Sequence, residues 1–228
     1  MASTTIEFAV QMTCKNCIDT IKSHFSDVQG IKDIQFYLEQ QRVVIQSTLP
    51  TLKLLQILES TGKKVAIKGY AGGQAAVSIL EAGNESIQGV VRFIQPTSDI
   101  CIVDGTVDGL KMGTYRSYIY ECGDISAGCE NVGNIFNPTN SPEGHSYGYL
   151  DKIISDDNKR ATFRFENNVI KVSDLIGRSF VITEESDNTK KIVCGVIARS
   201  AGLFQNPKLI CACDGTTVWD EASKKSAL

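Results

Sequence analysis

The hydrophobic pattern of this chain changes once, at a short glycine-rich stretch over residues 71–75, and this change restricts the fold more than any other feature. Before it, runs with the spacing of strands alternate with runs that have the spacing of helices. After it, the helical spacing disappears and short alternating runs continue. The 228 residues are enough for one large domain, or for two small domains with a tail. The pattern therefore predicts a multidomain protein, an α+β domain followed by an all-β domain.

Residues 1–70 are predicted to form a compact βαββαβ domain. Alternation typical of a half-buried strand over residues 5–12 is followed by helical spacing over residues 17–25. Two further strand-like runs, a second helix and a last strand over residues 63–68 complete the unit. The linker at residues 71–75 then separates this domain from the rest of the chain.

Residues 76–202 are predicted to form an antiparallel β-sandwich or barrel, because their alternating runs are separated by Gly, Asn, Asp and Pro. We expect the segment 125–160 to be a long loop, since glycine and proline recur in it. Residues 203–228 are too few and too polar to form a core, so we expect a short flexible C-terminal segment. The expected strands cover residues 76–80, 89–95, 100–107, 115–120, 161–165, 180–183 and 192–198.

Composition excludes several classes of function. The formal net charge of -3 does not favour a nucleic acid partner. No apolar run approaches the length of a membrane span, so stable membrane insertion is not expected. The first residues lack the basic region and apolar core of a secretory signal. Eight cysteines without such a signal point to metal or redox chemistry rather than to a secreted disulfide framework.

Two cysteine pairs stand at opposite ends of the chain, Cys14 with Cys17 and Cys211 with Cys213. Neither pair has a histidine or a third cysteine nearby in sequence. Two thiolates without further ligands suit a soft ion that accepts few ligands, and Cu(I) is the obvious candidate. A redox CxxC motif on a thioredoxin-like fold and a structural zinc site are the alternatives, although zinc needs two more ligands.

The run from Met12 to Cys17, Met-Thr-Cys-Lys-Asn-Cys, resembles the metal loop of the heavy-metal-associated domain of copper chaperones and copper pumps. The resemblance covers residues 5–70 and implies a ferredoxin-like fold with Cys14 and Cys17 as copper ligands. It also implies a packing role for Met12 and a cation near the metal from Lys63-Lys64. A thiolate at the start of a helix is favoured by the free backbone N–H groups and the helix dipole.

The run Tyr118-Ile-Tyr-Glu-Cys-Gly-Asp-Ile-Ser-Ala-Gly-Cys129 resembles a segment of copper-zinc superoxide dismutase, and later runs at 175–179 and 194–198 match that family in order. The resemblance covers about residues 76–200 and implies a Greek-key barrel. It further implies a disulfide between Cys129 and Cys194, with two free thiols as the alternative. Cys101 and Cys122 are expected to be buried, strand-borne small hydrophobic residues.

The dismutase metal ligands are missing from this chain. Imidazole-rich copper sites need several histidines, and the chain has only His24 and His145. Because these two histidines cannot supply such a site, we expect no dismutase activity. We assign His24 no role. The residues at the family's copper positions are Tyr118, Tyr120, Ile135 and Thr183; Tyr149 stands at the zinc aspartate position, and only His145 lies near the zinc loop.

A third resemblance covers the segment from Ala198 to Glu221. This segment contains Cys211-Ala-Cys213, followed by an acidic end around Trp219. Together with the two domains it resembles the copper chaperones for superoxide dismutase. The resemblance implies a cytoplasmic chaperone, with a mitochondrial intermembrane fraction left open. Trp219 is interpreted as an anchor.

The resemblance implies docking on immature copper-zinc superoxide dismutase as a heterodimer, with a homodimer through the same domain as a second state. Cu(I) is delivered and the target's disulfide is closed by thiol–disulfide exchange at Cys211 or Cys213. Two alternatives stay open. One is a protein that stores copper or zinc in a thiolate cluster, or uses it structurally, and the other is a dismutase variant.

Overall fold

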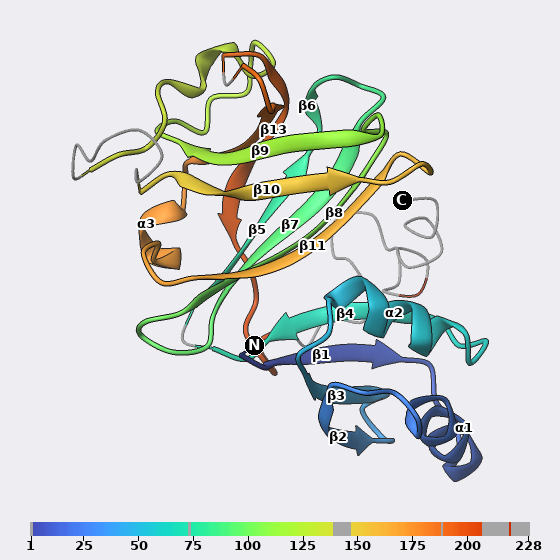
Figure 1. Cartoon of the computed structure of the whole chain (residues 1–228). Coiled ribbons are helices and arrows are strands. Elements are labelled where there is room, and N and C mark those ends of the chain that lie inside the picture. Colours follow the sequence, from blue (N-terminus) through green and yellow to red (C-terminus); the bar gives the residue numbers. More distant parts are fainter. Residues whose placement is uncertain (1, 73, 139–146, 188, 207–218, 220–228) are drawn as a thin grey trace. The chain divides into compact units, whose positions relative to one another are not determined.

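The structure is a computed structural model that describes residues 2–72, 74–138, 147–187, 189–206 and 219. The chain divides into two compact units, Met1–Gly73 with Ala201–Leu228, and Gln74–Ser200. Both units are drawn in Figure 1, and each is described here by itself. The predicted order, an α+β domain before an all-β domain, is confirmed. No helix in the described ranges is long and apolar enough to cross a membrane.

The first unit is a ferredoxin-like βαββαβ fold, as predicted (Figure 1). Its antiparallel sheet has the strand order β2-β3-β1-β4, which leaves β2 and β4 at the edges. Apolar side chains from β1, α1 and α2, including Phe8, Ile21 and Leu54, are fully buried and form its core. The elements are β1 (Thr4–Val10), α1 (Lys15–Phe25), β2 (Ile31–Tyr37), β3 (Arg42–Ser47), α2 (Thr51–Glu59) and β4 (Val65–Tyr70).

Proline and glycine set the limits of α2. Pro50 precedes α2 with φ -57°, a value already close to that of the helix. Gly62 follows the helix with φ +75°, and its N–H donates to the carbonyl of Glu59 at 2.9 Å. A left-handed residue at this position closes the helix, which is why glycine is suited to it.

The second unit is a Greek-key barrel (Figure 1). Its strands follow the path β10-β9-β12-β13-β5-β7-β8-β11, with β6 paired to β13, and β10 lies near β11 so that the sheet is almost closed. Inward side chains such as Phe93, Val103 and Phe180 are fully buried. The elements are β5 (Gln74–Leu80), β6 (Ala82–Gly83), β7 (Gln88–Gln95), β8 (Cys101–Asp108), β9 (Gly113–Tyr120), a 3-10 helix (Glu130–Val132), β10 (Tyr149–Ser155), β11 (Arg160–Asn167), α3 (Val172–Leu175), β12 (Ser179–Glu184) and β13 (Lys191–Arg199).

The prediction of a long loop over residues 125–160 is partly wrong, because β10 lies within that range. β10 pairs with β9, but the register shifts between Tyr149 and Lys152. A β-bulge interrupts the alternation of buried and exposed residues that identifies a strand in sequence. The sequence therefore does not identify β10 as a strand because of this bulge, although the strand contains apolar residues.

Two side-chain contacts link β8 to β11, one on each face of the sheet. Arg164 Nη1 donates to Asp104 Oδ2 at 2.9 Å, and both side chains are almost completely buried. Gly105 pairs with Phe163, whose ring occupies the space that a side chain at position 105 would need. A glycine in the middle of a strand is thus covered by an aromatic ring of the neighbouring strand.

Candidate metal centre

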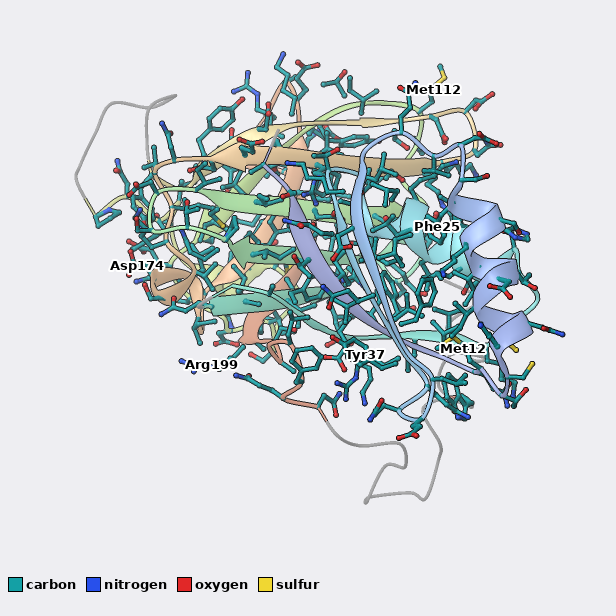
Figure 2. The ribbon with its side chains drawn as sticks, turned by 90° about the horizontal axis from the view of Figure 1, so that it is seen from below. Met12, Phe25, Tyr37, Met112, Asp174 and Arg199 are labelled. Atoms are coloured by element: carbon teal, nitrogen blue, oxygen red, sulfur yellow. A yellow bond between two sulfur atoms is a disulfide. The ribbon has the colours of Figure 1, made fainter. Side chains whose placement is uncertain are left out.

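The loop between β1 and α1 places Cys14 and Cys17 at the start of a helix. Cys14 is the N-cap residue with an extended backbone, φ -156° and ψ 170°, and no side chain caps the helix. Cys17 lies in the first turn, and its N–H donates to the carbonyl of Cys14 at 3.1 Å. Met12 lies just before this loop with its side chain only 1% exposed, so it packs in the core (Figure 2). The helix start therefore offers free N–H groups to negatively charged sulfur.

The two sulfurs lie side by side and are accessible. Cys14 Sγ and Cys17 Sγ are 3.7 Å apart, Cys14 is exposed and Cys17 is partly exposed. The Thr13 hydroxyl lies 3.9 Å from Cys17 Sγ. Two sulfurs at this separation, with no bond between them, can hold one soft metal ion between them.

The pKa of the Cys17 thiol is lowered from 9.0 to about 6. The largest cause is a backbone hydrogen bond at Thr13, followed by one at Cys14 and then by the side chain of Lys63. Each favours the charged form of the sulfur. At neutral pH Cys17 is therefore mainly a thiolate, which is the form that binds metals. The resemblance to heavy-metal-associated domains implies a cation from Lys63-Lys64, and Lys63 is the lysine that contacts the sulfur.

No other residues in the described ranges make a comparable metal site: no group of three or more His, Cys, Asp or Glu residues is found there. A tetrahedral structural zinc site would need such a group. Among the described residues, no such group surrounds the Cys14–Cys17 pair.

Tyrosines lie together at positions that the dismutase resemblance assigns to metal ligands. Tyr118 and Tyr120 are each 4% exposed. Their ring centroids are 6.3 Å apart, and Tyr149 lies 5.5 Å from Tyr118. Burial raises the pKa of Tyr120 to about 12, so it stays neutral. Ile135 forms a β-bridge with Tyr120, and Thr183 is fully buried. This apolar cluster offers no set of imidazole ligands.

The structure contains a disulfide between Cys129 and Cys194, the pair that the dismutase resemblance implies. Cys129 directly precedes the 3-10 helix, and Cys194 lies in β13, so the bond ties a loop to the barrel. Cys101 is buried as expected, and burial raises the pKa of its thiol to about 12. Cys122 is exposed, which corrects the expectation that it is buried. It lies two residues after the end of β9 and so beyond the packed part of the strand.

Cys211, Cys213 and His145 lie outside the described residues. Trp219 is described and is half-buried. The tail pair therefore remains a prediction from sequence.

Known proteins resemble this chain along both units. Residues 7–64 match the family described as heavy-metal-associated domain. Residues 87–202 match the family described as copper/zinc superoxide dismutase.

Three curated relatives carry closely similar names and match almost the whole chain. A "Copper chaperone for superoxide dismutase" from Homo sapiens is 40% identical, over 98% of this chain and 90% of the relative. A relative of the same name from Mus musculus is 41% identical, over 97% of this chain and 90% of the relative. A "Superoxide dismutase 1 copper chaperone" from Debaryomyces hansenii is 33% identical, over 97% and 96%.

Proposed function

The chain belongs to the family of copper chaperones for superoxide dismutase, and from this premise we propose that it binds Cu(I) through Cys14 and Cys17 and delivers it to an immature copper-zinc superoxide dismutase. The observation that carries this proposal is the accessible sulfur pair, 3.7 Å apart, with Cys17 already ionised at neutral pH. Cu(I) prefers thiolates and accepts two of them, whereas zinc would leave its coordination incomplete.

The barrel recognises the target and holds no metal of its own. Its tyrosine cluster, Tyr118 with Tyr120 and Tyr149, supports this role, because buried rings stand where ligands would be needed. A barrel that resembles a dismutase subunit can occupy the place of that subunit's own partner, since a twofold interface uses the same surface on both sides. We infer a heterodimer with the target in the cytosol, and a homodimer through the same surface when the target is absent.

We place the docking surface around Gly123 and Gly177, which form a close contact between two loops. A side-chain carbon at position 123 would lie 2.6 Å from the carbonyl oxygen of Gly177 and 3.1 Å from Val196 Cγ1. Ile176, next to Gly177, is 38% exposed, and Val196 is partly exposed. Small residues here keep the surface flat, and the two apolar side chains give it an apolar centre of the kind that interfaces use.

A charge placed on the docking surface tests this assignment. Ile176→Asp should weaken binding to immature dismutase at least tenfold, because a carboxylate would be desolvated in the interface. Ile154→Asp is the matched control, since Ile154 is 72% exposed on β10 and outside the proposed surface. Affinity is measured by titration calorimetry with copper-free target. Equal losses for both variants would contradict the assignment.

We propose that the tail pair closes the target's disulfide by exchange. The pair enters as a Cys211–Cys213 disulfide. A target thiolate attacks one tail sulfur, the tail disulfide breaks, and the other tail sulfur leaves as a thiolate. The second target thiolate then attacks the mixed disulfide, which closes the target's bond and leaves the tail as a dithiol. Two electrons have passed from target to tail, and an oxidant such as O₂ must remove them before the next cycle.

Two double variants separate copper loading from disulfide exchange. Cys211→Ser with Cys213→Ser should abolish maturation of the target even with ample copper, because no exchange partner remains. Cys14→Ser with Cys17→Ser should impair maturation mainly when copper is scarce. Target activity and the target's disulfide are measured together over a range of copper concentrations. Normal maturation by the tail variant would refute the exchange step.

A further inference from the structure

The chain returns to the first unit after the barrel and adds to the free edge of its sheet. Tyr70, the last residue of β4, forms a parallel bridge with Gly202. The N–H of Tyr70 donates to the carbonyl of Ala201 at 3.3 Å, and the N–H of Leu203 donates to the carbonyl of Tyr70 at 3.1 Å. Such strand addition satisfies backbone groups that an edge strand would leave unpaired. We call residues 201–205 the tail clip.

Phe204 fastens the tail clip to a buried ion pair in the same unit. Its N–H donates to Glu7 Oε2 at 2.6 Å, and Glu7 Oε1 lies 2.9 Å from Arg42 Nε. The Glu7 side chain is completely buried. The Phe204 ring lies 4.7 Å from Arg42 Cζ and 6.2 Å from the Tyr37 ring, which is labelled in Figure 2. The clip thus combines a hydrogen bond to a carboxylate with a cation–π contact.

The backbone of the tail clip has a specific shape. Phe204 has φ +61°, a conformation that residues other than glycine rarely adopt and that persists only where the surrounding contacts hold it. The N–H of Gly202 donates to Gln205 Oε1 at 3.0 Å, which closes the turn from the other side. A side chain at Gly69 of β4 would collide with the carbonyl oxygen of Gly202, so the approach also depends on that glycine.

We propose that the tail clip is an intramolecular docking site that holds the beginning of the Cys211–Cys213 segment on the copper-loading unit. Cys211 follows Phe204 by seven residues, and Cys14 follows Glu7 by seven residues. Seven residues span at most about 25 Å. Both cysteine pairs are thus tied closely to the Glu7–Phe204 contact, which raises their effective concentration toward one another. The benefit to copper transfer rests on the proposed function, but the docking contact does not.

Without the tail clip, the Cys211–Cys213 segment would be attached to the barrel instead of to the first unit. Ser200, whose N–H donates to the carbonyl of Ala75 in the barrel at 2.9 Å, would then be the last residue before Cys211 with a described backbone hydrogen bond outside the tail clip. The tether would lengthen from seven to eleven residues. Since reach grows in proportion to length, the volume open to Cys211 would grow roughly fourfold. Its point of attachment, Ser200, would also belong to the second unit and not to the unit that carries Cys14 and Cys17.

Two variants release the tail clip by different means. Phe204→Ala removes the ring that contacts Arg42 and leaves the folded core of the first unit unchanged. Gly69→Ala removes no group but forces the carbonyl of Gly202 away. Ile154→Ala is the control, because it removes an exposed apolar side chain from the barrel. Effects shared by the two clip variants and absent from the control report on docking and not on a general loss of stability.

Two measurements on the full chain test the proposal. Amide hydrogen exchange at Leu203 and Tyr70 should accelerate on the order of tenfold in both clip variants, since their hydrogen bonds open. Cross-linking of Cys14 or Cys17 to Cys211 or Cys213 with a short bis-maleimide should fall at least about fourfold. Alkylation of Cys14 and Cys17 with a monofunctional maleimide should stay unchanged, which shows that their loop is intact.

Unchanged exchange would show that there is no clip, and unchanged cross-linking would show that it does not position the tail; either result overturns the proposal. Neither measurement uses a dismutase. Failure of the intact protein to mature its target would instead refute the proposed function and leave both clip measurements valid.

Discussion

Replacing Lys63 by Met should raise the pKa of Cys17 and narrow the pH range of copper loading, because protons would then compete for the sulfur up to a higher pH. The thiol has a pKa of about 6 instead of 9.0, and Lys63 is the third of the three main contributions. A thiol with a pKa of about 6 is roughly nine-tenths thiolate at pH 7, whereas one at 9.0 is about one per cent thiolate. Removing a nearby cation raises a thiol pKa by roughly one unit. The backbone hydrogen bonds at Thr13 and Cys14 remain, so the shift should be partial.

Alkylation with iodoacetamide between pH 4 and 10 measures this pKa, and mass spectrometry of the peptide that contains Cys17 provides the readout. The midpoint of the profile is compared, and not the rate at one pH, because a thiolate of higher pKa is also the stronger nucleophile. A Cys14→Ser background leaves one thiol in the motif. Lys64→Met is the matched control, since Lys64 is not among the causes of the shift.

The expected midpoints are about 6 for the Cys14→Ser background and its Lys64→Met derivative, and about one unit higher for the Lys63→Met derivative. Because the pKa is lowered, the thiolate is present above the midpoint and is lost as the pH falls through it. Cu(I) affinity should therefore weaken below about pH 6 in the intact motif, where a proton competes for the sulfur. A midpoint near 9 in the background, or equal shifts for the two lysine variants, would refute the electrostatic argument.

Three further predictions concern the barrel, and urea unfolding followed by circular dichroism tests each. Cys129→Ser should lower the free energy of unfolding by about 4 kcal/mol, since the disulfide closes a loop of 65 residues, whereas Cys122→Ser should change it by about 0.5 kcal/mol or less. Arg164→Met should cost about 1.5–3 kcal/mol by removing a charged hydrogen-bond partner of the buried Asp104, and adding Asp104→Leu should recover part of this loss. Gly105→Ala should cost about 1–3 kcal/mol through collision with the ring opposite it. A midpoint equal to that of the wild type for Cys129→Ser, Arg164→Met or Gly105→Ala would contradict the corresponding argument.

Local patterns predict the first unit well, because its strand-like and helical runs follow one another with clear changes of spacing. β1 is recognised although its register with β4 shifts between Glu7 and Phe8, and the helical spacing of α1 comes directly after the CxxC loop, so the position of Cys14 and Cys17 at a helix start follows from sequence. The barrel is predicted less completely. β10 was missed because a bulge between Tyr149 and Lys152 interrupts its alternation.

Other features depend on contacts that no local pattern records. Sequence cannot separate Lys63 from Lys64, since only the direction of each side chain decides which one meets the sulfur. The tail clip was missed for a related reason. The hydrogen bond from Phe204 to Glu7 joins residues 197 positions apart, and neither residue belongs to a recognisable motif. Contacts of this kind come from the tertiary fold.

The central claim is that thiolates carry the copper and that the barrel carries none. Equilibrium dialysis against chelator-buffered Cu(I) tests it most directly, with a variant in which Cys14, Cys17, Cys211 and Cys213 are all serine. This variant keeps the Cys129–Cys194 disulfide and the tyrosine cluster. We predict that it retains no copper, whereas the wild-type protein retains copper in a shell of sulfur ligands by X-ray absorption. Stoichiometric copper in the variant, bound through nitrogen or oxygen, would contradict the account.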